Sequence, residues 1–438
     1  MKASDECGGR AVSAGNAGCD FATPAYVFDE AAFLTRAGEC RDAISAGVKL
    51  CFSMKANPFL LRIMPDVIDS IEVCSPGELT ICERAGIGMD RVIYSGVCKG
   101  IVDIRRAVAD GVSAVTAESP FQFETICRAA RECGRTVDVL LRLTDGSQFG
   151  MDISELTAII RGRDSHPEVK IRGIHYFTGT QKRSTETVVR QLLMLEKLIV
   201  SLQDETGFET ERLEYGPGLD AEYFAEIRAE CRTECCSGGK ETGDRPAGAE
   251  NIGADPGPGS ADLHDIELER LRAVAPALRR LSEITDVTIE IGRLLASSCG
   301  TYYTTVCDTK VNKGVNYAIC DGGIHQMRYG GQLQGMRRPV MSVLRDGSPI
   351  ECADGEDSGG VWTLYGSLCS TADIFVRDAQ MPHLHRGDMV AFYNTGAYSV
   401  CEGMALFLSR ELPQVWLRTR DGSLRLLREK TETNSLNY

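Results

Sequence analysis

Between Glu30 and Ile291 the chain alternates short apolar runs, rich in β-branched residues, with longer segments of helical periodicity. Eight runs have the length and composition of buried strands: Val48–Met54, Ile71–Cys74, Val92–Tyr94, Ala114–Thr116, Val137–Leu143, Lys170–Phe177, Arg212–Tyr215 and Val287–Ile291. Helical periodicity is found between them in Pro58–Ile68, Gly77–Ala85, Ile101–Ala109, Phe121–Cys133, Ile153–Arg161, Thr187–Gln203 and Leu268–Ile284. Strands that alternate with helices form a parallel sheet, and eight of them can close a barrel. The pattern therefore predicts an α/β fold built on a (β/α)8 TIM-like barrel.

Beyond Ile291 the pattern changes to apolar runs separated by Gly, Asp and Asn turns, with little helical periodicity. The predicted strands are Tyr302–Val306, Tyr317–Cys320, Val340–Leu344, Trp362–Leu364, Asp388–Tyr393 and Gln414–Arg418. Ala25–Phe28 could add a further strand to them. We therefore expect a barrel domain at residues 30–291 and a C-terminal β-sandwich or β-barrel domain made of residues 21–29 and 292–438.

Three segments lack the pattern of a packed element. Residues 1–20 are rich in Gly, Ala and Ser, and the insertion Arg232–Leu263 is crowded with Gly, Glu, Asp and Pro. Asp354–Gly360 is a shorter insertion of the same kind. Such segments bury too little apolar surface to offset the entropy lost on ordering. We expect a disordered tail and two flexible surface loops, the longer one at residues 232–263.

Composition and charge narrow the classes of function. The 438 residues are 43% hydrophobic and 25% charged, as in an ordinary globular protein. A net charge of −14 provides no basic surface for nucleic acid or an anionic membrane. The N-terminal residues lack the apolar core of a signal peptide, and no stretch approaches the ~20 apolar residues that span a membrane. We therefore expect a cytoplasmic protein that binds neither nucleic acid nor membrane.

The 18 cysteines do not form the pattern of a metal site or a disulfide framework. Most of them stand singly in apolar segments, where cysteine acts as a small hydrophobe; examples are Cys74, Cys82, Cys320 and Cys401. The cluster of Cys231, Cys235 and Cys236 lacks the paired Cys-x-x-Cys spacing of zinc sites. We expect no bound metal.

Lys55 stands where an apolar run ends, in Cys51-Phe52-Ser53-Met54-Lys55-Ala56-Asn57-Pro58. Desolvation at the end of a buried strand would lower the pKa of this amine and leave it partly neutral. A neutral amine can attack an aldehyde to form a Schiff base, which is how pyridoxal 5'-phosphate is held. A single lysine after an apolar run is more often a surface residue, so the case rests on the other strand ends.

The working residues of a (β/α) barrel lie just beyond the C-terminal ends of its strands. The predicted strand ends carry Lys55, Ser75, Arg142, the stretch from His175 to Gln181, Gly216-Pro217-Gly218 and Glu290-Ile291-Gly292-Arg293. Gly216 and Gly218 allow backbone amides to approach an anion, and Thr180 can add a hydroxyl. Together these groups suit a phosphate.

In combination the motifs resemble those of the fold type III pyridoxal-phosphate decarboxylases, the ornithine, diaminopimelate and arginine decarboxylase family, which is related in fold to alanine racemase. The resemblance runs from about Ala22 to Leu417. It is carried by Thr23-Pro24-Ala25-Tyr26-Val27, Met54-Lys55-Ala56-Asn57-Pro58, Cys74-Ser75-Pro76-Gly77-Glu78-Leu79, Ser147-Gln148-Phe149-Gly150, Gly179-Thr180-Gln181, Glu290-Ile291-Gly292-Arg293, Cys369-Ser370-Thr371-Ala372-Asp373 and Gly396-Ala397-Tyr398. It implies an alanine racemase-like fold and pyridoxal 5'-phosphate as the cofactor.

The resemblance gives roles to individual residues. It implies that Lys55 is the Schiff-base lysine and that Glu290 keeps the pyridine nitrogen protonated. A protonated ring accepts the electrons left at Cα by loss of CO2 far better than a neutral ring does. The residues that match positions around the cofactor phosphate are Thr180, Gly216, Gly218, Arg293 and Tyr398.

Cys369 matches the cysteine that returns a proton to Cα after decarboxylation. A positioned acid of this kind is worth roughly 10²–10⁴ in rate. In the family this cysteine and its neighbours reach the cofactor of the partner subunit. The resemblance therefore implies a homodimer with shared active sites.

Two departures from the family pattern concern the cofactor ring and the substrate. Phe177 stands where the family has a histidine stacked on the ring, and phenylalanine can stack but cannot exchange a proton. We expect His175, assigned to the opposite face of its strand, to be a core histidine. Ser370 stands where decarboxylases of diamino acids carry Glu or Asp to hold the distal ammonium. Arg328, Ser370 and Asp373 are the candidate substrate residues, and Asp373 could still bind a distal amine.

The leading hypothesis is an enzyme, a carboxy-lyase that removes the α-carboxyl group of an amino acid or an amino-acid derivative. Diaminopimelate decarboxylase of lysine biosynthesis is the commonest role of such a chain, although Ser370 argues against a free diamino acid. A carrier-tethered aminoacyl group is a further candidate substrate. A racemase or a non-catalytic homologue that binds the cofactor is the alternative of another class.

Overall fold

The computed structural model describes residues 11–12, 21–44, 46–224, 260–329, 337–350 and 359–438. The tail and the two insertions predicted to be flexible lie mostly outside these residues, as do Cys231, Cys235 and Cys236. The chain divides into two compact units. One comprises Phe33–Ala221 and Asp265–Ala296, and the other comprises Met1–Ala32, Glu222–His264 and Ser297–Tyr438.

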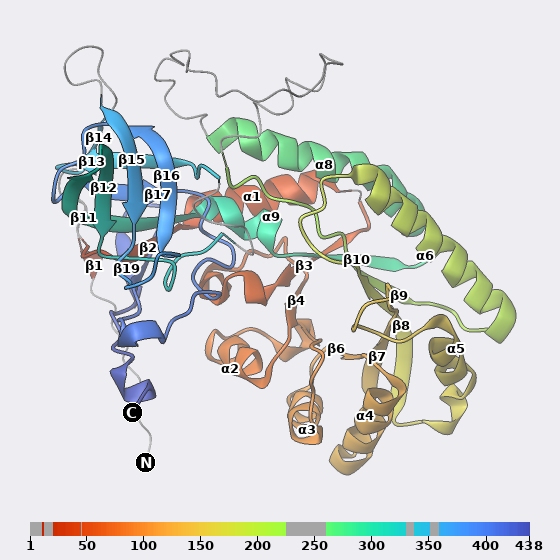
Figure 1. The fold of residues 1–438 in the computed structure, drawn as a ribbon. Coiled ribbons are helices and arrows are strands. Elements are labelled where there is room, and N and C mark those ends of the chain that lie inside the picture. The colour runs from red at the N-terminus through yellow and green to blue at the C-terminus, as the bar shows by residue number, and fades with distance from the viewer. Residues whose placement is uncertain (1–10, 13–20, 45, 225–259, 330–336, 351–358) are drawn as a thin grey trace. The chain divides into compact units, whose positions relative to one another are not determined.

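The first unit is a closed barrel of parallel strands in the order β10-β3-β4-β5-β6-β7-β8-β9 (Figure 1). These strands are β3 (Lys49–Ser53), β4 (Ser70–Val73), β5 (Val92–Tyr94), β6 (Ala114–Ala117), β7 (Val137–Arg142), β8 (Val169–Phe177), β9 (Arg212–Gly216) and β10 (Asp286–Ile291). The barrel closes where Thr288 on β10 pairs with Lys49 on β3. All eight predicted strands are confirmed, because buried runs of β-branched residues mark them clearly.

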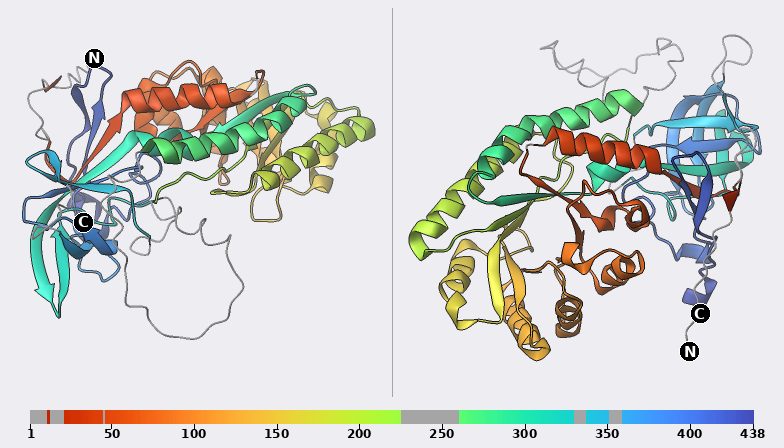
Figure 2. Two further views of the ribbon diagram at one scale, coloured as in Figure 1. Left: turned by 90° about the horizontal axis from the view of Figure 1, so that it is seen from above. Right: turned by 180° about the vertical axis from the view of Figure 1, so that it is seen from behind.

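Helices alternate with the barrel strands along the chain, as the two further views in Figure 2 show. They are α1 (Glu30–Ala43), α2 (Pro76–Arg84), α3 (Ile101–Asp110), α4 (Pro120–Cys133), α5 (Ile153–Arg161), α6 (Thr185–Thr206), α8 (Ser260–Leu281) and α9 (Arg293–Ala296). Short 3-10 helices are η1 (Met54–Ala56), η2 (Pro58–Ile63), η3 (Met89–Arg91), η4 (Arg163–Ser165), η5 (Ser297–Cys299), η6 (Phe407–Ser409) and η7 (Asn434–Leu436). No described helix is long and apolar enough to cross a membrane.

Local signals explain the helix ends. The Ser75 side chain accepts a hydrogen bond from the Glu78 amide, and Pro76 occupies the first turn, where its missing N–H costs nothing. The helix predicted at Pro58–Ile68 is wrong, because only the 3-10 helix η2 forms there. Met64 is extended (φ −64°, ψ 118°), as expected for a residue that precedes a proline, here Pro65.

The second unit is a mostly antiparallel sheet, in which β2 pairs with β11 and β18. Its strands in the described residues are β1 (Ala11–Val12), β2 (Ala25–Asp29), β11 (Gly300–Asn312), β12 (Val315–Cys320), β13 (Met341–Arg345), β14 (Ser348–Ile350), β15 (Gly360–Tyr365), β16 (Ile374–Met381), β17 (Met389–Phe392), β18 (Gln414–Arg418) and β19 (Leu424–Arg428). The predicted β domain is confirmed, including the strand at Ala25–Phe28. Strands β1, β14, β16 and β19 had not been predicted, and β1 lies within the tail that was expected to be disordered.

The prediction that the cysteines act as small buried hydrophobes is confirmed only in part. Cys51, Cys82 and Cys320 are buried. Cys401 is exposed instead, because it lies in the loop between β17 and η6. Cys74 is half-buried and lies beside Lys55.

Candidate active site

Lys55 lies in η1, directly after strand β3 at the C-terminal end of the barrel. The motif folds locally because Asn57 ends η1 in an extended conformation and its side chain accepts a hydrogen bond from the Phe59 amide. The Lys55 Nζ donates to both carboxylate oxygens of Glu72 on β4, at 2.7 and 3.0 Å. It also lies 3.7 Å from the Cys74 sulfur.

The surroundings of Lys55 differ from the apolar setting that was expected for this amine. Its side chain is 41% exposed, whereas that of Glu72 is 4% exposed. Burial would raise the pKa of Glu72, but the Lys55 ammonium outweighs it and lowers the pKa to about 2. Lys55 therefore faces a buried carboxylate, and not the apolar setting that the sequence predicted.

Glu290 on β10 is buried and contacts His175 on β8. The His175 Nε2 lies 3.1 Å from one oxygen of Glu290 and 3.3 Å from the other. The prediction of a buried histidine is confirmed, but its assignment to the face opposite Phe177 is wrong. Residues two apart on a strand share a face, and His175 therefore points into the barrel beside the predicted ring-nitrogen carboxylate.

Phe177 ends strand β8 and packs against Gly216 at the end of β9. The two residues are neighbours in the register of β8 and β9. A Cβ at Gly216 would overlap the Phe177 ring. The absence of a side chain at position 216 therefore lets the Phe177 ring approach the backbone closely at the barrel end.

The loops that follow β8 and β9 are held together by backbone contacts. The Lys182 amide donates to the Gly218 carbonyl at 2.8 Å, and Gly218 has a left-handed φ of +62°. A Cβ on Gly218 would overlap the Gly179 carbonyl oxygen, beside the exposed Thr180. These glycines create a close backbone approach that only glycine permits.

The donor set at this end of the barrel fits pyridoxal phosphate. Arg293 begins helix α9 and is buried, and Gly292 before it lies so close to Ser53 and Ala56 that a Cβ would be 2.9 Å from the nearest atom. A guanidinium, a hydroxyl and a glycine backbone are the donors that a phosphate accepts from. Lys55 and Glu290 supply the amine and the carboxylate that the rest of the cofactor needs.

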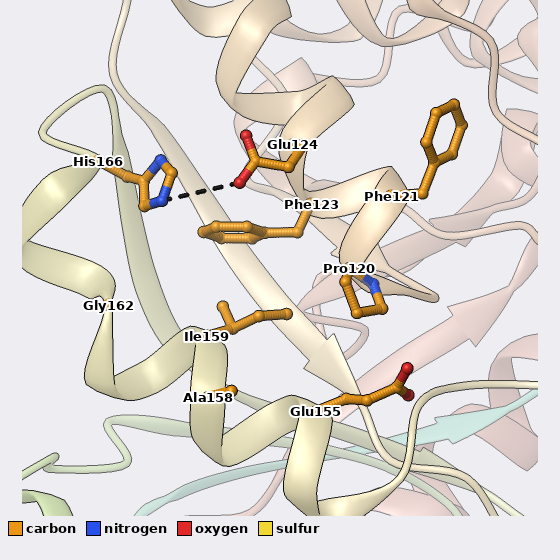
Figure 3. Close-up of a pocket in the computed structure, with 9 residues that line it drawn as sticks. All are labelled: Pro120, Phe121, Phe123, Glu124, Glu155, Ala158, Ile159, Gly162 and His166. Atoms are coloured by element: carbon orange, nitrogen blue, oxygen red, sulfur yellow. Dashed lines mark ion pairs between the residues drawn. The ribbon is translucent and has the colours of Figure 1, made fainter.

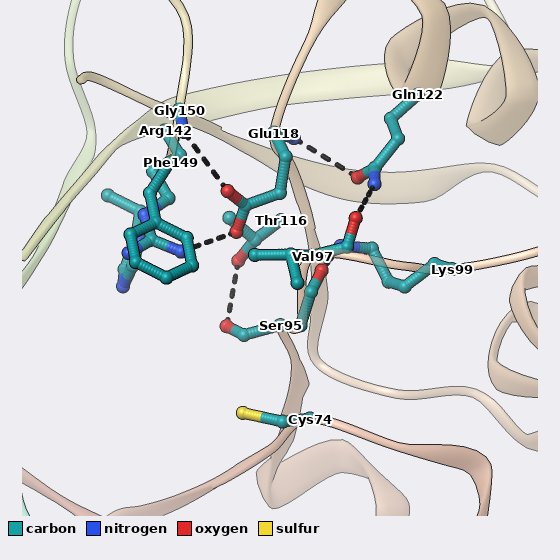
Figure 4. Close-up of polar contacts among 12 residues, drawn as sticks. Cys74, Ser95, Val97, Lys99, Thr116, Glu118, Gln122, Arg142, Phe149 and Gly150 are labelled. Carbon is teal, nitrogen blue, oxygen red and sulfur yellow. Dashed lines mark hydrogen bonds and ion pairs between the residues drawn. The ribbon is translucent and has the colours of Figure 1, made fainter. Parts of the chain in front are cut away.

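A second polar cluster at the strand ends was not predicted from the sequence. Figure 4 shows Glu118 between the Arg142 side chain and the Gly150 amide, at 2.5 and 3.1 Å. The Arg142 guanidinium lies 4.8 Å from the centre of the Phe149 ring. Lys99 is buried nearby, and this burial lowers its pKa to about 8. Glu118 directly follows β6, and this position is the signal that could have identified it. Lys99 lies in the loop between β5 and α3 and stands in no recognisable motif.

The other predicted site residues belong to the second unit. Cys369 is exposed in the loop between β15 and β16. Asp373 in the same loop is fully buried, and its oxygens accept hydrogen bonds from the amides of Ile324 and Leu368 at 2.8 and 2.7 Å. A Cβ on Gly366 would overlap both of these oxygens. Asp373 thus holds the loop that carries Cys369 and Ser370.

Tyr398 and Arg328 also lie in this second unit, each half-buried. Tyr398 has a left-handed φ of +66°, a conformation that non-glycine residues rarely adopt. The preceding residues are fixed by the hydrogen bond from the Gly396 amide to the Ser297 carbonyl, at 3.0 Å. Backbone strain of this kind is often found at ligand-binding positions.

An open pocket of about 490 Å³ lies elsewhere, between helices α4 and α5 (Figure 3). None of the predicted site residues lines it. His166 at its edge, with Cys127 and Glu168, brings three possible metal-ligand atoms within 4.8 Å of one another. Glu168 is already paired with Arg131, so its carboxylate is committed to an arginine.

Comparisons with known proteins agree with this geometry. Residues 31–236 match the family model described as "Pyridoxal-dependent decarboxylase, pyridoxal binding domain". The chain is 26% identical, over 94% of its length and 92% of the relative's, to the L-glutamyl-[BtrI acyl-carrier protein] decarboxylase of Niallia circulans. It is 24% identical to the diaminopimelate decarboxylase of Bacillus subtilis, over 86% and 82% of the two chains.

Solved structures share the fold. The diaminopimelate decarboxylase of Methanocaldococcus jannaschii, crystallised with L-lysine, matches with a TM-score of 0.73 at 19% identity. The match covers 94% of this chain and 90% of that one. Both the barrel and the β unit are therefore found together in a known protein.

Proposed function

Because the chain belongs to the fold type III pyridoxal-phosphate decarboxylases, we propose that it removes the α-carboxyl group of an aminoacyl substrate with no free distal ammonium group. An aminoacyl group tethered to a carrier protein is the favoured substrate. The observation that carries this proposal is the engagement of both Asp373 oxygens with backbone amides. The only acid in the Cys369 loop is therefore occupied.

The position after Cys369 supports the same substrate class. Ser370 offers a hydroxyl, which accepts a hydrogen bond from the Ala372 amide, and carries no charge. An ammonium buried without a carboxylate loses several kcal/mol of solvation free energy. A substrate whose distal end is acylated avoids this loss. The Niallia circulans relative, whose name specifies a glutamyl group on a carrier protein, is consistent with it.

The residues at the barrel end have different proposed roles. Pyridoxal phosphate supplies an electron-accepting ring for the electrons that CO2 loss leaves at Cα. We assign to Lys55 the covalent attachment of the cofactor, and Glu72 forms an ion pair with its amine in the structure. Glu290 would hold a proton at the ring nitrogen, and Phe177 would stack on the ring. The burial of Glu72 and Glu290 strengthens their charged contacts.

Phosphate binding is the second role that we propose for residues of the site. We assign it to Arg293, Thr180 and the backbone at Gly216 and Gly218, with Tyr398 as a further donor. Gly218 accepts the Lys182 amide with its carbonyl, which fixes the loop without a ligand. A preorganised cradle loses little entropy when an anion binds.

Cys369 is the proposed proton donor to Cα, and its exposure in this unit is consistent with a role in a homodimer. Mixing Lys55→Ala and Cys369→Ala subunits tests the shared site. If each site takes residues from both subunits, the inactive variants together regain about a quarter of the wild-type activity, because half the dimers contain one intact site. Mixed subunits that stay inactive while forming dimers would exclude a shared site.

The substrate is tested by CO2 release from a panel of free diamino acids, acidic amino acids and carrier-linked aminoacyl groups. We expect turnover of a tethered or acidic substrate. Ser370→Glu should raise the activity toward diaminopimelate or lysine, whereas Thr371→Glu, which places the same charge one residue further, should not. Efficient turnover of a free diamino acid by the unaltered protein would favour the second candidate, a diaminopimelate or related decarboxylase, as in the Bacillus subtilis relative.

A further inference from the structure

Three buried titratable side chains stand on three consecutive strands of the barrel. His175 on β8 and Glu214 on β9 are partners in the strand register, and Glu214 pairs with Thr288 on β10. Glu290 lies two residues after Thr288 and therefore on the same face. His175 is 2% exposed, Glu214 0% and Glu290 8%, so water has little access to any of them.

The hydrogen bonds of this group leave two atoms without partners. The Nε2 of His175 contacts Glu290, and Arg212 donates twice to the Oε2 of Glu214, at 2.9 and 3.1 Å. Among the described residues, the Nδ1 of His175 and the Oε1 of Glu214 have no hydrogen-bond partner although both are buried. The two atoms are not hydrogen-bonded to each other in the structure, but a buried nitrogen that can donate and a buried oxygen that can accept, on neighbouring strands, are complementary.

The charges around these atoms leave one position uncompensated. Three of the barrel carboxylates have a cationic partner: Glu72 pairs with Lys55, Glu118 with Arg142 and Glu214 with Arg212. Glu290, by contrast, pairs only with His175 among the ion pairs of the described residues. A positive charge on the imidazole would balance it.

The other titratable side chains around His175 and Glu214 do not compete for a proton shared between these two residues. Cys51 on β3 faces Glu214 and Glu290, and burial raises the pKa of its thiol well above the ordinary value, which keeps it neutral. Arg142 on β7, the register partner of His175 on its other side, is engaged by Glu118. Burial raises the pKa of Glu214 to about 7; the Glu290 charge adds to this, while Arg212 and His175 oppose it. Glu214 can therefore be neutral or ionised near neutral pH.

We propose that Glu214 is a positioning residue of this active site, which shares a proton with the Nδ1 of His175 and so holds the imidazole between two carboxyl groups. In one state Glu214 is a neutral acid that donates to Nδ1; in the other, Glu214 is a carboxylate and His175 an imidazolium. The number of protons is the same in both, and Nε2–H is donated to Glu290 throughout. Glu290 thereby keeps a fixed direction at the ring nitrogen, as second-layer partners fix catalytic side chains elsewhere.

This inference rests on the proposed function only through the role of Glu290, and its test does not require turnover. The full-length, cofactor-loaded protein is labelled with ¹⁵N-histidine, and the six histidines are followed by NMR from about pH 5 to about pH 9. The signal of His175 is identified by its loss in His175→Gln. The amide of Glu214→Gln cannot exchange a proton, so the pH dependence of the His175 Nδ1 signal should differ from that of the wild-type protein.

A matched control separates this effect from a general loss of charge. Glu211→Gln removes an acid three residues earlier, which is exposed and paired with Arg172. It should leave His175 unchanged, and Glu214→Asp, which keeps the acid, should restore part of the wild-type titration. The bound-cofactor absorbance should change with pH in Glu214→Gln, and kcat should fall while KM stays near the wild-type value.

Two results would overturn the proposal. One is an unchanged His175 titration in a folded Glu214→Gln protein. The other needs no variant: if the wild-type Nδ1 never carries or accepts a hydrogen-bonded proton over that pH range, Glu214 and His175 do not share one. A protein that shows the expected His175 behaviour but releases no CO2 from any substrate would leave this inference intact and refute the proposed function.

Discussion

Gly216→Ala tests whether the close approach of Phe177 to the backbone serves the cofactor. The added methyl group would overlap one carbon of the Phe177 ring and lie 3.2 and 3.3 Å from two others. Carbon atoms pack best at about 3.5–4.0 Å, so the ring would have to move by roughly 1 Å. Gly216 is not among the glycines with a left-handed φ, so alanine adds no backbone strain there.

The expected loss of cofactor affinity follows from this steric contact. Overpacking of this size costs about 1–3 kcal/mol, which corresponds to roughly 5- to 150-fold weaker binding of pyridoxal phosphate if the displaced ring enters the cofactor position. The assay is a titration of the cofactor-free protein with pyridoxal phosphate, followed by absorbance. Thermal unfolding without cofactor reports separately on the cost to the fold.

Two comparisons make the reasoning refutable. Gly162→Ala adds a methyl group at ordinary distances of 3.6 and 3.7 Å in the same unit and should not change cofactor affinity. Phe177→Leu combined with Gly216→Ala should fold better than Gly216→Ala alone, because the smaller side chain makes room. A Gly216→Ala protein that binds the cofactor with wild-type affinity would show that the ring position does not matter for binding.

Three further variants address the amine, its partner and the proton donor. Lys55→Ala should abolish covalent attachment of the cofactor, and a cofactor adduct that survives borohydride reduction in the mass spectrum of this variant would contradict the assignment. Glu72→Gln should weaken the pH dependence of stability in acid: the pKa of Glu72 is lowered from 4.5 to about 2, so its stabilisation is complete above 4.5 and is lost as the pH falls towards 2. Acid unfolding of the cofactor-free protein, monitored by circular dichroism, measures this, and identical acid transitions would contradict it. Cys369→Ala should lower kcat by roughly 10²–10⁴ and increase misdirected protonation of the product, and unchanged turnover would remove Cys369 from the mechanism.

The barrel was predictable because its signals are local. Each strand is a short buried run, and each helix such as α5 has periodicity and a cap of its own, here the Asp152 capping box. Strand β16 was missed because its run Ile374–Met381 is interrupted by Arg377 and Asp378, and its position depends on pairing with β15. Pairing between distant segments leaves little mark on either one.

The residues of the candidate site likewise divide into those with a local sequence signal and those whose role depends on distant segments. Lys55, Glu290 and the glycines stand in recognisable motifs at strand ends, so sequence alone could single them out. Glu72 and Glu214 carry no motif, and their importance depends on which strands become neighbours in the closed barrel. Asp373 looked like a possible substrate ligand, but its hydrogen bonds to the amides of Ile324 and Leu368 are visible only in three dimensions.

The position of β2 constrains how the chain can be made. This strand precedes the barrel in the chain, yet it pairs with β11 through Tyr26 and Tyr302 and with β18 through Tyr26 and Val415. Both partners are synthesised hundreds of residues later, so the emerging strand has unpaired edges during most of translation. Unpaired edges invite association with other chains. A nascent chain that stalls before Gln414 would keep one of these edges open, and it is there that a chaperone would be most useful to this protein.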